Sequence, residues 1–133
     1  MTIAEVSEKY DITADTLRYY ERIGLIPPVP RTPSGIRDYD GASCDWVGLM
    51  KCMRAAGVQI EALVEYVTLY RQGDTTIDAR KTILLEQRKL LTDRIAEMEK
   101  SLEKLDYKIS LYEDGKMTEQ YHREHPCKES GKK

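Results

Sequence analysis

The cysteines are the residues best suited to covalent chemistry, and Cys52 has the most favourable neighbours. Lys51 and Arg54 lie close to it in the sequence, and positive charge stabilises the reactive thiolate form of a cysteine. Cys44 lies eight residues earlier on the same predicted helix, a rise of ~12 Å that excludes a disulfide between the two. Cys52 is therefore a candidate nucleophile. The alternative is that it packs as a small buried apolar residue.

Three further donor side chains lie near the C-terminus, at His122, His125 and Cys127. They could form part of a metal site, but a structural zinc site needs four ligands. We therefore expect no metal here and keep a metal-responsive site as the alternative. An enzyme could use Cys52 with one of these histidines as its base, but no motif supplies an orienting carboxylate. We predict that the protein is not an enzyme and needs no cofactor.

The composition describes a small protein with a highly charged surface. The chain has 133 residues, a net charge of −2, one Trp and no Phe. Its three cysteines lack the spacing of a disulfide framework. No segment resembles a signal peptide or reaches the ~20 apolar residues of a membrane span, so we expect a cytoplasmic protein without a membrane partner. Any contact with nucleic acid must come from a few local cations.

Apolar residues at helical spacing predict two short helices at the start of the chain. The first is expected to stop near Asp11, and the second to be capped by Thr13 and to end at Gly24. Residues 25–40 contain four of the five prolines, which excludes a helix there. We predict a small hairpin in this segment, with its tip at residues 33–35.

Two more helices are predicted before a break at residues 73–74. Ser43 can cap the third helix, which Gly57 ends. The fourth is expected from about residue 59 to residue 71.

A long helix is predicted from residue 76 to about residue 113, where the chain holds no Pro and no Gly. Apolar residues recur in it every seven positions in two rows, and such a seam cannot be buried by a lone helix. A partner helix is therefore implied. The alternative is that the helix folds back on its own domain. The seam residues are Ile77, Leu84, Leu91, Ile95, Met98, Leu102, Leu105 and Ile109.

One long motif and several short ones carry a family resemblance. The run TLRYYERIGLIPP is followed by an isolated arginine, a Gly-Ile-Arg step, a tyrosine and the run MRAAG, at residues 16–28, 31, 35–37, 39 and 53–57. Together they resemble the MerR family of dimeric transcriptional regulators. The resemblance implies a mainly α fold in which a winged helix-turn-helix DNA-binding domain precedes an antiparallel coiled-coil dimerisation helix. The corresponding ranges are 1–73 and 74–114, with a polar tail at 115–133.

The resemblance implies that the second helix enters the major groove of promoter DNA and that the hairpin is the wing beside it. A homodimer would sit on a palindromic element in an overlong promoter spacer and distort it for RNA polymerase. The alternative for both elements is an ordinary charged surface that is exposed to water and binds no DNA. The implied groove residues are Thr16, Arg18, Tyr19 and Arg22, and the implied phosphate contacts are Arg31, Arg37 and Tyr39.

The resemblance also suggests what the protein senses. The long helix opens without the cysteine of metal-responsive members. Drug-sensing members carry a large effector domain, and because this sequence ends soon after the helix we expect no bulky ligand pocket of that kind. Cys52 is similar to the reactive cysteine of the aldehyde- and thiol-responsive AdhR/NmlR-like subgroup. This implies that Cys52 is the sensor. A coiled-coil adaptor without DNA remains the alternative that would explain the long helix alone.

Overall fold

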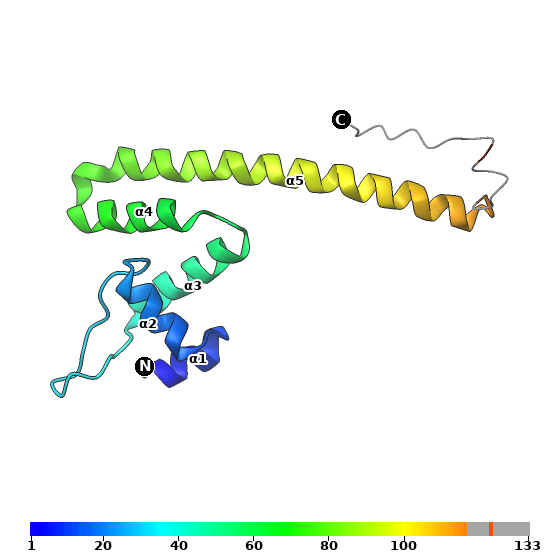
Figure 1. The fold of residues 1–133 in the computed structure, drawn as a ribbon. Helices are drawn as coiled ribbons and strands as arrows, with labels where there is room; N and C mark the ends of the chain where they lie inside the picture. The colour runs from blue at the N-terminus through cyan, green and yellow to red at the C-terminus, as the bar shows by residue number, and fades with distance from the viewer. Residues whose placement is uncertain (117–122, 124–133) are drawn as a thin grey trace. The chain divides into compact units, whose positions relative to one another are not determined.

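The computed structural model describes residues 1–116 and residue 123 and is mainly helical in that part. The chain divides into two compact units, Met1–Leu91 and Thr92–Lys133, and each is described by itself. None of the helices in this described part combines the length and the apolar character of a membrane span. In chain order the helices are α1 (Ile3–Tyr10), α2 (Ala14–Arg22), α3 (Gly41–Ala55), α4 (Ile60–Gln72), a 3₁₀ turn (Asp74–Thr76) and α5 (Ile77–Glu113) (Figure 1).

The first two helices form the predicted helix-turn-helix. The chain leaves α1 through Asp11, whose φ of 54° is left-handed. Thr13 caps α2 by accepting a hydrogen bond from the backbone N–H of Thr16 at 3.1 Å. Gly24, with a φ of 83°, follows the end of α2. The predicted stop of the first helix and the predicted cap of the second are both confirmed.

The predicted cap of the third helix was wrong. Asp40, not Ser43, caps α3, and its Oδ1 accepts a hydrogen bond from the Ser43 N–H at 2.8 Å. Ser43 lies inside the first turn and is buried, because the helix begins one turn earlier than expected. Gly57 follows the end of α3 with a φ of 84°, as predicted. The fourth helix is displaced by one residue from the predicted range.

The proline-rich segment forms the predicted hairpin, and its residues 31–39 are called the wing from here on. Arg31 and Arg37 form an antiparallel β-bridge across it. Gly35 has a φ of 90°, which suits the turn at the tip. No strand is assigned among the described residues, so the wing is a minimal two-sided loop.

A single apolar core fixes these elements relative to one another within the first unit. Each large side chain that folding buries contributes about 1.5–3 kcal/mol relative to remaining in water. The fully buried members come from α1, α2, the segment that follows α2, the wing, α3 and α4, so α2 and the wing share one support. They are Val6, Leu17, Leu25, Ile26, Tyr39, Val47, Met50 and Val67.

Helix α5 has 37 residues, and its seam is exposed in the isolated chain. Within the second unit, Ile95, Met98, Leu102, Leu105 and Ile109 are between 48% and 65% exposed. These residues lie on one side of a helix of period 3.6. The described part of the second unit does not bury these side chains. Leu91, the last residue of the first unit, is by contrast half-buried.

Candidate nucleic-acid interface and thiol site

Helix α2 presents a charged and aromatic face to the exterior. Leu17 and Tyr20 are buried, whereas Arg18, Tyr19 and Arg22 are exposed. The Arg22 guanidinium lies over the Tyr19 ring, 5.3 Å from its centroid. Such stacking holds a long cationic side chain in a defined direction. The structure therefore brings three of the four predicted groove residues onto one exposed surface.

Two local contacts hold the start of this face. Arg18 donates to the Asp15 carboxylate at 2.9 Å, and both side chains are open to solvent. An exposed pair of this kind is worth at most about 1 kcal/mol, so a phosphate or a base can compete for Arg18. Thr16, the fourth predicted groove residue, is half-buried, and its hydroxyl accepts a hydrogen bond from the Thr13 hydroxyl at 2.9 Å.

Glu21 connects the wing to α2, a role that the sequence analysis missed. Its carboxylate accepts from Arg37 Nε at 2.7 Å and from the Val29 N–H at 2.9 Å. Burial alone would raise the pKa of Glu21. The hydrogen bonds from Arg37 and Val29, with the charges of Arg37 and Arg31, outweigh burial and lower it. Arg37 therefore anchors the wing, while Arg31 is exposed and donates to the Gly35 carbonyl at 2.9 Å.

The predicted phosphate contact by Tyr39 was wrong. Tyr39 is 1% exposed and belongs to the apolar core. Its hydroxyl has no hydrogen-bond partner in the described structure, and burial raises its pKa. A ring that is buried in the core cannot also reach a phosphate. The tyrosine therefore anchors the end of the wing in the core.

Replacing Glu21 should loosen the wing in a pH-dependent way. Glu21→Gln is expected to destabilise the protein by about 1 kcal/mol near pH 7, because it removes the charge that strengthens two hydrogen bonds. The pKa of Glu21 is lowered by folding. Its stabilisation is therefore complete above the unfolded value and is lost as the pH falls through the folded value.

Urea unfolding between pH 7 and pH 3 measures this difference. The gap between wild type and variant should narrow as the pH falls, whereas Glu65→Gln, on the exposed side of α4, should leave stability unchanged. A gap that is the same at every pH would contradict the role of the charge.

The two cysteines in the described residues differ in accessibility. Cys44 is buried, with its Sγ 3.8 Å from Met1 Sδ, whereas Cys52 is exposed on α3. The neighbouring cations point elsewhere: Lys51 Nζ donates to the Tyr10 carbonyl and Arg54 to the Val58 carbonyl. The exposure of Cys52 therefore supports its reactivity. Lys51 and Arg54 were expected to stabilise its thiolate, but they donate to backbone carbonyls instead.

The alternative metal site belongs to a part of the chain that the structure does not describe. His122, His125 and Cys127 lie outside the described residues. Within residues 1–116, no three His, Cys, Asp or Glu side chains gather as a metal site would require.

Comparison with known proteins identifies the family. Residues 2–39 match the model of the MerR family regulatory proteins. The transcriptional regulator AdhR of Bacillus subtilis is 56% identical over 93 residues. That match covers 70% of this chain and 66% of AdhR, just under two thirds of its length.

Two crystal structures extend the match over most of the chain. A MerR family regulator from Listeria monocytogenes is 46% identical with a TM-score of 0.84, and the match covers 85% of this chain and 86% of that one. HiNmlR, a MerR family regulator lacking the sensor domain and bound to promoter DNA, is 32% identical with a TM-score of 0.77, covering 86% and 91%. This chain therefore belongs to the MerR family of DNA-binding transcriptional regulators, not to a family of enzymes.

Proposed function

We propose that the protein binds a palindromic promoter element as a homodimer, alters the shape of that DNA, and responds to reactive aldehydes through Cys52. One observation carries this proposal. Helix α2 exposes a face made of Arg18, Tyr19 and Arg22, and the wing beside it is anchored to the same helix. In the same chain, the apolar seam of α5 is exposed.

The α2 face is suited to reading bases. An arginine in the major groove can donate two hydrogen bonds to a guanine, so Arg18 and Arg22 are the proposed readers, with Tyr19 and Thr16 beside them. Arg31, exposed on the wing, is the proposed phosphate contact, and Arg37 positions the wing through Glu21. The promoter DNA bound to HiNmlR supports this use of the fold.

A palindrome requires a two-fold symmetric reader. Pairing two α5 helices in antiparallel fashion would cover both seams at once and place two copies of α2 on successive half-sites. In this proposal residues 1–73 bind DNA, residues 74–114 dimerise, and RNA polymerase uses the distorted promoter. An inducer acts by favouring one of the two DNA shapes.

The two classes of DNA contact can be separated by titration. Arg18→Ala should weaken binding to the palindromic duplex by about 10- to 100-fold and affect a random duplex much less, because it removes a base contact. Arg31→Ala should weaken both duplexes alike and reduce the salt slope by about one unit, because it removes a phosphate contact.

The duplex for this test is the site footprinted beside the protein's own coding sequence, against a scrambled duplex of equal length. Titrations from 50 to 200 mM salt give both quantities. If both variants lose the same affinity for the two duplexes, Arg18 does not read bases. If neither variant weakens binding, the proposed interface is contradicted.

A further inference from the structure

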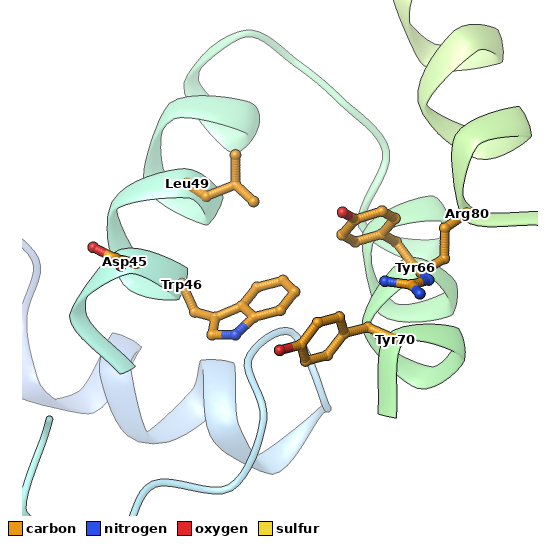
Figure 2. Close-up of a pocket in the computed structure, with 6 residues that line it drawn as sticks. All are labelled: Asp45, Trp46, Leu49, Tyr66, Tyr70 and Arg80. Carbon is orange, nitrogen blue, oxygen red and sulfur yellow. The ribbon is translucent and has the colours of Figure 1, made fainter. Parts of the chain in front are cut away.

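A pocket lies between α3, α4 and the start of α5, entirely within the first unit. It is an open pocket of about 240 Å³ and is lined by Asp45, Trp46, Leu49, Tyr66, Tyr70 and Arg80. Figure 2 shows the indole of Trp46, from α3, facing the two tyrosine rings of α4. Trp46 meets Tyr70 edge-on at 5.0 Å between ring centroids and Tyr66 at 6.1 Å.

We propose that this pocket binds a small aromatic molecule that carries a carboxylate. The volume fits such a ligand, since a cavity of about 150 Å³ is sufficient for a benzene ring. Three aromatic rings and Leu49 offer edges and faces to one planar guest.

Arg80 supplies the polar specificity. Its guanidinium lies over the Tyr70 ring at 5.4 Å, and its Nε donates to Thr76 Oγ1 at 3.0 Å. These contacts, with the donation from Nη2 to the Gly73 carbonyl at 3.5 Å, fix its direction, and Nη1 can donate a charge-assisted hydrogen bond to a carboxylate. Asp45, the opposing charge, is exposed, and in Figure 2 its carboxylate is directed away from the rings.

Occupancy of this pocket would join three helices. Trp46 belongs to α3 of the DNA-binding fold, Tyr66 and Tyr70 to α4, and Arg80 to the first turns of α5. A ligand in contact with all three favours one arrangement of these helices over others. The effect on transcription rests on the proposed function, whereas binding itself does not.

The chain contains one tryptophan, Trp46, which gives a direct readout of the pocket. In the full-length protein labelled with ¹⁵N, benzoate should shift the single indole N–H signal saturably. Cyclohexanecarboxylate, which keeps the charge but not the aromatic ring, and benzyl alcohol, which keeps the ring but not the charge, should each bind about tenfold more weakly. No saturable shift with benzoate would overturn the proposal, and equal binding of all three probes would overturn the ligand class.

Two variants locate the site. Tyr70→Leu and Arg80→Gln should each weaken benzoate binding about tenfold, while Tyr107→Leu, on an exposed tyrosine outside the pocket, should leave it unchanged. Circular dichroism checks that each variant is folded. If Arg80→Gln does not fold, the comparison of benzoate with benzyl alcohol on the wild type still tests the role of the charge. Undiminished binding to folded Tyr70→Leu would place benzoate elsewhere and overturn the site.

Discussion

Two charges placed in the apolar seam of α5 are expected to separate the proposed dimer into monomers. The double variant Met98→Glu and Leu102→Glu gives the clearest test, because both side chains are more than half exposed in the single chain. The substitutions therefore leave the packing of one subunit intact. In a dimer they would bury unpaired carboxylates, each costing about 3–5 kcal/mol, so association should weaken by more than about a thousandfold.

Light scattering coupled to size-exclusion chromatography measures the change directly. A matched control is Ala96→Glu with Tyr107→Glu, which adds the same charge to exposed positions on the opposite side of α5. The control should remain dimeric, and the seam variant should also lose cooperative binding to the palindrome. A dimer that survives both seam charges would show that α5 does not pair through these rows.

The helices could be predicted because their signals are local. Thr13 precedes its helix directly, and the absence of Pro and Gly after residue 76 is read from consecutive positions. The exposed rows on α5 follow from period alone, since every seventh position returns to the same side. The Ser43 cap failed because Asp40, three residues earlier, offers a competing side-chain acceptor.

The site was harder to predict because it depends on contacts between distant residues. Glu21 and Arg37 are sixteen residues apart, so spacing gives no indication that they pair. The resemblance placed Tyr39 among the phosphate contacts of the wing, but its side chain is buried in the core. The same holds for the Trp46 pocket, whose lining comes from three helices.

The second large effect is expected at Cys52, whose replacement should abolish the proposed response to aldehydes. A thiol adds to the carbonyl carbon of an aldehyde: the S–C bond forms, the C=O π bond becomes a hydroxyl, and the thiol proton ends on that oxygen. No oxidant is needed. Of the two cysteines in the described residues, Cys52 is the exposed one, and a reagent must first reach the sulfur.

An adduct at Cys52 has a short physical route to the DNA-binding helices. Lys51, the adjacent residue on α3, donates to the Tyr10 carbonyl at the end of α1. On the other side, Arg54 holds the Val58 carbonyl in the turn before α4 at 2.6 Å. A larger side chain between these two anchors can favour one packing of α1, α3 and α4 over another. This is the differential free energy that an inducer must supply.

In vitro transcription from the bound promoter, with and without formaldehyde or methylglyoxal, tests this expectation. Wild type should be induced, Cys52→Ser should not respond, and Cys44→Ser should respond like wild type because its thiol is buried. Mass spectrometry of the treated protein should locate the adduct on Cys52. Full induction in Cys52→Ser would remove this residue as the sensor. A response that required Cys127 and added zinc would point instead to metal sensing, because thiolate and imidazole ligands together favour that ion.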